Sequence, residues 1–333
     1  MKTALPRRQG SAVGTPNRSS AATVATATVA AVGLGALAWG TLVERNRFTV
    51  RREIVPVLDP GAQPIRILHI TDLHMAPWQH GKQEWVRNLR ALEPDLVINT
   101  GDNLGHAAGI DGVERALEPF RGIPGLYVNG SNDYHGPKAK NPFGYLLGPS
   151  RWREDPARLN TSRLEAFFES LGWQSLNNSA VSMDIAGSPL DFFGVDDPHI
   201  GRDRLDSLPG ILDELREESE EASRPDRDVT SIGVTHAPYR RVLNSFVTHG
   251  AELIVAGHTH GGQVCVPGYG ALVTNCDLPR SQASGLSLWK HAMRAAYLNV
   301  SAGLGTSIYA PIRFACKPEA VLLTLTGDDF GYS

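Results

Sequence analysis

Seven side chains with oxygen or nitrogen donor atoms follow short apolar runs in five separate stretches of the sequence. They are Asp72, His74, Asp102, Asn132, His236, His258 and His260. Carboxylate, imidazole and amide donors without cysteine suit manganese, iron or zinc ions. One catalytic ion of the zinc type takes about three protein ligands, whereas two ions about 3.5–4 Å apart and bridged by a carboxylate would use the whole set. The pattern therefore predicts a hydrolytic centre with two divalent or trivalent metal ions.

The apolar runs before these side chains have the length and β-branched content of strands that are buried on both faces. These stretches are residues 65–74, 95–103, 125–133, 229–238 and 251–262. Helical patterns between and after the first three stretches cover residues 83–92, 113–120 and 162–171. The order of strand, helix and strand predicts an α/β protein. In such folds function gathers at the carboxyl ends of the strands, which is where the donor side chains stand.

Four further segments lie outside this repeating pattern. Residues 135–160 are rich in Gly, Pro and basic side chains and have the length of a lid or substrate-facing loop. Residues 201–228 read as a charged helix followed by a solvated linker. Residues 263–296 contain Gly-Pro turns and a short predicted helix, "LSLWKHAMRAA", and residues 320–325 read as a closing strand.

The N-terminal part of the chain has the features of a membrane segment. Residues 19–43 carry no charge, and about 20 apolar residues suffice to cross a bilayer as a helix. We favour an anchor, with a cleaved signal sequence as the alternative, because Ala36-Leu37-Ala38 has the small-x-small form of a cleavage site. We expect a basic tail, an anchor or signal segment, a linker, the main domain and a C-terminal tail, over residues 1–20, 21–43, 44–63, 64–326 and 327–333.

The composition argues against a dedicated nucleic-acid-binding protein and against a disulfide-rich one. The 333 residues carry 32 basic and 35 acidic side chains, for a formal net charge of -3, so no global field attracts nucleic acid. Three cysteines, Cys265, Cys276 and Cys316, are too few and too widely spaced for a disulfide framework or a cysteine zinc site, and their odd number leaves at least one thiol unpaired. His69 lies inside the first predicted strand, where a hydrogen-bonded core histidine is a more common finding than a ligand.

The motifs "DLH", "GDN", "GSND", "TH" and "GHTHGG", in this order and at these spacings, resemble those of the calcineurin-like metallophosphoesterases over residues 64–325. Together with "GVDDPH" and "VSAGLGTSIYAPIRF", they are similar to the branch of membrane-associated or exported bacterial phosphoesterases. The resemblance implies a sandwich of two mixed β-sheets flanked by α-helices. It also implies that Asp102 bridges two ions. The remaining ligands fall into two sets, Asp72, His74 and His260 for the first ion, and His236, His258 and an amide oxygen of the third motif for the second.

The third motif, "GSND", departs from the family pattern of Gly-Asn-His followed by Asp or Glu. An ungapped match puts Ser131 at the ligand position and Asn132 at the position of the catalytic histidine. A one-residue bulge restores Asn132 as the ligand, which we favour because a carbonyl oxygen suits the site better than a neutral hydroxyl. Asn132, Asp133 and His135 are the candidates for the catalytic role of the missing histidine. Candidate substrate-binding residues are Asn103, Ser131 and His199.

The function that these observations predict is hydrolysis of a phosphomonoester or phosphodiester by a hydroxide that bridges the two ions. The expected substrate is a phosphoester, with a lipid-linked or envelope-derived one suggested by the nearby membrane segment. We expect a membrane-associated protein whose catalytic domain is extracytoplasmic, although basic residues on both sides of the segment do not fix its orientation. Two alternatives remain open: a non-catalytic, metal-stabilised interaction module of the same fold, and a nuclease with the same centre. The oligomeric state is left open.

Overall fold

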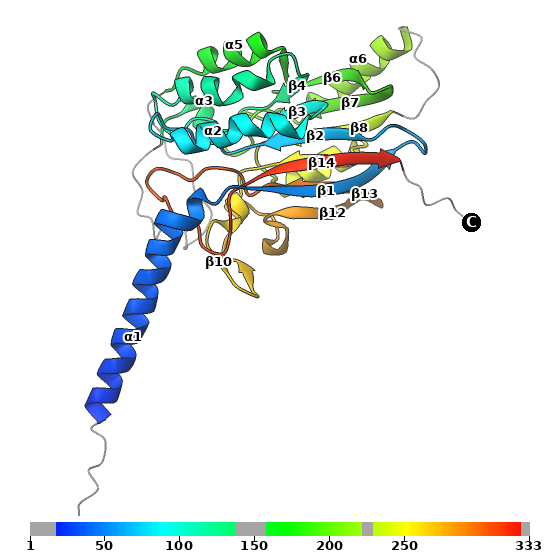
Figure 1. Ribbon diagram of the computed structural model, residues 1–333. Helices are drawn as coiled ribbons and strands as arrows, with labels where there is room; N and C mark the ends of the chain where they lie inside the picture. Colours follow the sequence, from blue (N-terminus) through cyan, green and yellow to red (C-terminus); the bar gives the residue numbers. More distant parts are fainter. Residues whose placement is uncertain (1–17, 138–157, 222–228, 328–333) are drawn as a thin grey trace, which may run out of the picture.

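The computed structural model describes residues 18–137, 158–221 and 229–327. Most of the predicted lid over residues 135–160 therefore lies outside the described residues, as do the first 17 residues and the last six. The described chain forms two six-stranded sheets flanked by helices, with one long helix projecting from the domain (Figure 1).

The strands of the first sheet follow the order β1-β14-β2-β3-β4-β5. Their bounds are Thr49–Leu58, Glu319–Gly327, Ile65–Ile70, Leu96–Asn99, Gly125–Tyr127 and Trp173–Ser175. The second sheet follows the order β12-β13-β9-β8-β7-β6. Its strands are Gly285–His291, Arg294–Val300, Leu253–Ala256, Thr230–Thr235, Ser188–Gly194 and Ser179–Ile185. Both sheets combine parallel and antiparallel pairs, so the predicted sandwich of two mixed sheets is confirmed.

Apolar side chains that alternate along each strand hold the layers together. In β2, Ile65 and Ile67 belong to a core that also includes Phe192, Ile232 and Val255 of the second sheet. Leu68 and Ile70 of β2 face the opposite way, because side chains of a strand alternate between its two faces. They pack against α2 (His80–Asn88), α3 (Ile110–Leu117) and α5 (Thr161–Leu171), which cover the outer face of the first sheet (Figure 1).

Helices α6 (Leu208–Glu221) and α7 (Arg240–Thr248) contribute to a third core on the second sheet. The shorter helices are α4 (Ser131–Tyr134), η3 (Leu89–Leu92), η4 (Glu118–Phe120), η6 (His260–Gly262) and η7 (Arg280–Gln282). A two-stranded hairpin is made of β10 (Cys265–Val266) and β11 (Gly270–Ala271). The three helices predicted over residues 83–92, 113–120 and 162–171 and the closing strand over residues 320–325 are confirmed.

The projecting helix α1 (Arg18–Ala38) continues through a π-turn, η1 (Trp39–Val43), into a short 3-10 turn, η2 (Glu44–Asn46). Residues Thr23–Asn46 are long and apolar enough to cross a membrane, and only 6% of the apolar window is buried against the rest of the chain. A signal sequence near the N-terminus would meet the same criteria of length and composition.

Two segments differ from the sequence-based expectation. The predicted linker over residues 44–63 contains β1, which pairs in parallel with β14 from Thr49 opposite Glu319. The predicted helix "LSLWKHAMRAA" is instead the hairpin of β12 and β13, turning at Ala292 and Met293 in left-handed conformations. The physical reason is alternation: Leu288 is exposed while Trp289 is buried, as in a strand with one face on the core.

Candidate metal centre

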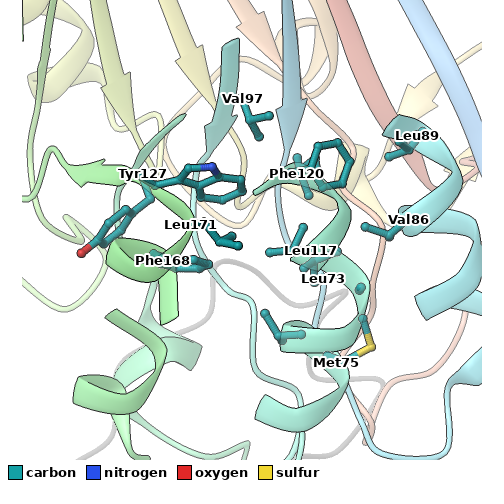
Figure 2. Close-up of a cluster of buried hydrophobic side chains, with 14 of the residues drawn as sticks. Leu73, Met75, Val86, Leu89, Val97, Leu117, Phe120, Tyr127, Phe168 and Leu171 are labelled. Atoms are coloured by element: carbon teal, nitrogen blue, oxygen red, sulfur yellow. The ribbon is translucent and has the colours of Figure 1, made fainter. Parts of the chain in front are cut away.

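The candidate ligands lie just beyond the carboxyl ends of strands from both sheets. In the first stretch, Leu73 and Met75 are buried among the helices that cover the first sheet (Figure 2), whereas Asp72 and His74 belong to a group of converging donor atoms. The local backbone is strained. Five candidate ligands have positive φ angles, which L-residues with a Cβ atom disfavour, namely Asp72, His74, Asp102, His258 and His260. Such outliers cluster at functional sites because the surrounding structure holds them in place.

Asp72, His74 and His260 form one buried group whose donor atoms converge. The Nε2 atoms of the two histidines are 3.2 Å apart, and they lie 3.9 and 3.7 Å from Oδ1 of Asp72. The other oxygen, Oδ2, is held by the Thr71 hydroxyl at 2.8 Å and by the backbone N–H of His258 at 3.0 Å. Within the described residues Oδ1 has no hydrogen-bond partner although it is buried. A cation between these three atoms would satisfy it, so the donor set fits a metal ion.

Asp72, Asp102 and His236 form a second buried group, which shares Asp72 with the first. The Asp102 carboxylate lies between the two groups: Oδ2 is 3.5 Å from Nε2 of His74, and Oδ1 is 3.6 Å from Nε2 of His236. Nδ1 of His258 lies 3.2 Å from Nε2 of His236. The arrangement brings Asp102 close to a histidine of each group and His258 to the side of His236.

Hydrogen bonds outside the two groups orient the imidazole rings. Nδ1 of His236 lies 2.6 Å from the carbonyl oxygen of Thr100, which leaves Nε2 directed at the carboxylates. Nε2 of His258 lies 3.2 Å from the carbonyl oxygen of Asn275, which leaves Nδ1 on the side of His236. Partners of this kind fix the ring orientation of metal-binding histidines and make the free nitrogen more basic.

The electrostatic environment favours cation binding. Burial lowers the pKa of His74 to about 4 and that of His260 well below its usual value, so both rings are neutral and able to donate a lone pair. Burial also lowers the pKa of His236, but the charges of Asp102, Asp197 and Asp72 outweigh it and raise the pKa to about 9. A bound cation would take the place of the His236 proton in neutralising these carboxylates.

In the third motif the structure places Asn132, and not Ser131, against the bridging position. The backbone N–H of Asn132 donates to Oδ1 of Asp102 at 2.7 Å, and its side-chain amide donates to Oδ2 at 2.7 Å. A half-turn of the amide would present its carbonyl oxygen instead. Ser131 opens α4 and accepts the backbone N–H of His135 through its carbonyl oxygen. The third motif therefore contacts Asp102 through Asn132.

Two predicted roles are corrected. The Asp133 carboxylate is buried and accepts backbone N–H groups of Asp102, Asn103 and Gly130 at 2.9, 2.7 and 3.0 Å. It fastens the second and third motif loops to each other, which is a positioning role and not the predicted catalytic one. The Asn103 amide is fully buried and contacts Asn99 and Asp133, so it is not available to bind substrate. Sequence alone does not reveal the direction in which these side chains point.

The two other candidate histidines, His199 and His135, differ in their position relative to the two groups of donor atoms. The His199 ring centre is 4.7 Å from that of His258, and its Nδ1 lies 3.0 Å from the Tyr239 hydroxyl, so it adjoins the site. His135 belongs to neither group of converging donors in the part of the chain that the structure describes. Its backbone bridges to Arg158 and its ring centre is 6.4 Å from that of Tyr134.

Sequence reasoning missed a buried arginine and a glycine that support the ligands. Arg313 is fully buried and donates to the carbonyl oxygens of Ala302, Gly303 and Gly305 at 2.6, 3.0 and 2.7 Å. A further bond of 3.4 Å reaches the carbonyl oxygen of His260. Gly303 packs so tightly that a Cβ atom there would lie 2.5 Å from Cβ of Asp72. Both residues belong to the motif "VSAGLGTSIYAPIRF", but the sequence does not show which atoms they contact.

A third missed residue is Asp197 in the "GVDDPH" motif. Its Oδ1 accepts the backbone N–H of His199 at 2.8 Å, while its buried Oδ2 has no hydrogen-bond partner among the described residues. Its charge is one of those that raise the pKa of His236. The loop of the "GVDDPH" motif thus contributes negative charge to the site.

The chain is similar to known proteins over the region that contains this centre. The model of the calcineurin-like phosphoesterase family matches residues 65–262. The chain is 23% identical to a Bacillus subtilis (strain 168) protein described as an uncharacterized metallophosphoesterase, YkuE, over 85% of this chain and 86% of that protein. It is 25% identical to a Bos taurus transmembrane protein with a metallophosphoesterase domain, over 78% of this chain and 55% of that protein. Among solved structures, TT1561 of Thermus thermophilus is similar with a TM-score of 0.40 and 13% identity, over 73% of this chain and 91% of that one.

Proposed function

Since the chain belongs to the calcineurin-like phosphoesterase family, and is a metal-dependent phosphoric ester hydrolase, we propose that two metal ions work at the buried centre. The observation that carries this proposal is the position of Asp102, whose two oxygens face His74 and His236 in separate donor groups. One ion would take Asp72, His74 and His260, and the other His236, His258 and Asn132, with Asp102 shared. Bound ions would act as Lewis acids on the phosphoryl oxygens and lower the pKa of a water molecule.

The residues of this chain prepare the site for that chemistry. Thr71 and the backbone of His258 fix one oxygen of Asp72, so the other oxygen is directed at the ions. The Asp133 carboxylate holds the loops of Asp102 and Asn132 at a fixed distance. Because these groups are buried and already oriented, little reorganisation accompanies the reaction, which is the main way in which a protein stabilises developing charge.

His199 and Asn132 are the groups that we place nearest to a bound phosphoester. The His199 ring lies tilted beside that of His258, and Asn132 contacts Asp102. His199 lies outside the third motif, and within that motif Asn132 is an amide, whereas the family pattern has a histidine there. We therefore expect faster turnover of esters whose leaving groups are weakly basic and need no protonation.

We also propose that the protein works at a membrane surface on a lipid-linked or envelope-derived phosphoester, with its domain on the extracytoplasmic side. Support comes from the junction with the apolar helix: the Gly40 carbonyl oxygen accepts the backbone N–H of Arg313 at 3.1 Å, and the Glu44 carboxylate accepts that of Cys316 at 2.7 Å. β1 starts beside the start of β14, which pairs in turn with the end of β2, and Asp72 follows from that end. The helix therefore meets the domain at the end that carries the centre.

The test of this function uses the full-length chain in detergent, because cutting within residues 49–58 would remove part of β1. After supplementation with Mn²⁺, Fe²⁺ or Zn²⁺, hydrolysis is measured on p-nitrophenyl phosphate, bis-p-nitrophenyl phosphate, nucleotides, nucleic acid and phospholipids. We expect hydrolysis of the activated esters and of at least one lipid phosphoester. Absence of hydrolysis on every substrate with every metal would favour the non-catalytic module. Preference for nucleic acid would favour the nuclease.

A further inference from the structure

Two of the three cysteines lie together directly behind the ligand loop, by which we mean residues 257–262 with His258 and His260. The Cys265 thiol donates to the carbonyl oxygen of Gly261 at 3.2 Å. The Cys316 thiol contacts the same oxygen at 3.5 Å and donates to the carbonyl oxygen of His260 at 3.2 Å. Both sulfur atoms therefore converge on one point of the backbone.

The backbone keeps the two cysteines side by side. Val264 and Phe314 form a parallel bridge, the N–H of Cys265 donates to the carbonyl oxygen of Phe314 at 2.8 Å, and the N–H of Phe314 donates to that of Gln263 at 3.0 Å. The parallel register sets Cys265 level with Ala315, which has a left-handed conformation and directly precedes Cys316. Because both thiols contact the carbonyl oxygen of Gly261, rotation of the two side chains can bring the sulfur atoms together.

A cavity gives reagents access to the pair. It has a volume of about 750 Å³ and both cysteines line it, together with Gly261, Glu44 and Lys317. Cys265 is the more accessible of the two, and Cys316 is buried behind it. The third cysteine, Cys276, is buried elsewhere and belongs to the core of the second sheet. Cys276 therefore serves as an internal control for the reactions of the other two thiols.

We propose that Cys265 and Cys316 form an intramolecular disulfide at the base of the ligand loop when the protein meets a disulfide donor. The thiolate of one cysteine attacks an external disulfide and releases one external thiolate. The thiolate of the other cysteine then attacks the protein sulfur of the mixed disulfide and releases the second. Two protein thiols are oxidised, one external disulfide is reduced to two thiols, and the two protons pass to solvent or to the released thiolates.

The bond would change what supports His260. Oxidation removes the S–H donors to the carbonyl oxygens of His260 and Gly261, while Arg313 still donates to that of His260. It also ties the segment after the ligand loop to the segment that leads into β14. We therefore expect the oxidised protein to unfold several degrees higher than the reduced one, because the cross-link restricts the unfolded chain.

The test follows the thiols of the full-length protein and does not depend on hydrolytic activity. Reduced protein in detergent is incubated with oxidised glutathione, denatured, alkylated with N-ethylmaleimide and analysed by intact and peptide mass spectrometry. We expect one alkylated cysteine, Cys276, and a cross-linked peptide pair that contains Cys265 and Cys316. Cys276→Ser should form the same cross-link with no alkylated cysteine, whereas Cys316→Ser should stop at glutathione bound to Cys265.

Three outcomes would overturn the proposal. They are three alkylated cysteines after oxidation, a cross-link that includes Cys276, and a stable glutathione adduct on Cys265 in the unsubstituted protein. Melting curves with and without reductant supply the second measurement. An unchanged melting temperature despite the cross-link would contradict the predicted constraint. Because these results are independent of turnover, they stand whether or not the proposed hydrolysis is found.

Discussion

Asn132 contacts both oxygens of the Asp102 carboxylate, one through its backbone N–H and the other through its side-chain amide, each at 2.7 Å. The motif "GSND" thus delivers an amide to the bridging carboxylate by means of the first turn of α4. The neighbouring serine makes no such contact among the described residues. Asn132 is therefore the position at which the third motif acts on the centre.

Replacing Asn132 with alanine should weaken binding of one ion and slow hydrolysis by about 10–100-fold, because groups that hold or orient a metal ligand contribute on that scale. Ser131→Ala is the matched control and should change either quantity less than about threefold. Metal titrations followed by activity and by calorimetry provide the measurement. A larger effect at Ser131 than at Asn132 would reverse the assignment in favour of the ungapped alignment.

Gly303→Ala should destabilise the protein and weaken metal binding, because the new Cβ atom would lie 2.5 Å from Cβ of Asp72. Gly201→Ala is the control: it has a similar positive φ angle but no atom within 4 Å of a Cβ. The conformational cost, about 1 kcal/mol, is common to both. We expect Gly303→Ala to lower the free energy of unfolding by a further ~1–3 kcal/mol, measured by urea denaturation. Equal losses of unfolding free energy in the two variants would mean that the segment around Gly303 shifts to make room for the methyl group without further cost.

Arg313→Met should lower the free energy of unfolding by about 3 kcal/mol or more, because it leaves buried carbonyl oxygens without donors. Those oxygens belong to Ala302, Gly303 and Gly305. Arg163→Met, which removes an exposed arginine that pairs with Asp111 and Glu114, should leave the unfolding free energy nearly unchanged. Metal content should fall only in the first variant. Normal metal content in Arg313→Met would contradict a supporting role for this side chain.

His69 provides a prediction about pH. Burial, with a smaller effect of the Arg51 charge, lowers the pKa of His69 from 6.5 to about 3 in the folded protein. The unfolded chain therefore binds more protons between these values, and the contribution to stability is full above pH 6.5 and is lost as the pH falls through that range. His69→Gln should remove this contribution.

In numbers, the loss of unfolding free energy from about pH 7 to about pH 5 should be smaller in His69→Gln than in the parent by about 2 kcal/mol. Urea denaturation of both proteins at one metal concentration measures it. The exposed His80, changed to Gln, serves as the control and should follow the parent. An identical acid dependence in all three proteins would show that His69 is not buried as a neutral ring.

The sequence predicted the strand ends well because the relevant pattern is local. An aliphatic run that stops at Asp72, Asp102 or His258 is read directly from hydrophobicity and turn residues. The convergence of these ends followed from the order of strands and helices, and the structure brings their donors together in two buried groups. The sandwich followed from the family resemblance and was confirmed by the two mixed sheets.

What the sequence did not reveal depends on contacts between distant segments. Residues 49–58 form a strand only because β14 lies beside them. The opposite roles of Asn132 and Asp133 depend on which of two adjacent polar side chains turns toward Asp102. The supporting role of Arg313 depends on its hydrogen bonds to backbone carbonyl oxygens, which surround it only after folding.

The central claim, two ions bridged by Asp102, is tested most directly by counting metal ions per chain in the full-length protein and in Asp102→Ala. The exposed Asp206→Ala serves as the control for the substitution itself. After equilibration with Mn²⁺ and removal of free metal, elemental analysis should give two ions per chain in the parent and in Asp206→Ala. In Asp102→Ala we predict fewer than two ions and hydrolysis of bis-p-nitrophenyl phosphate slower by about 10³-fold or more. One ion or none in the parent, or two ions and full activity in Asp102→Ala, would contradict the account.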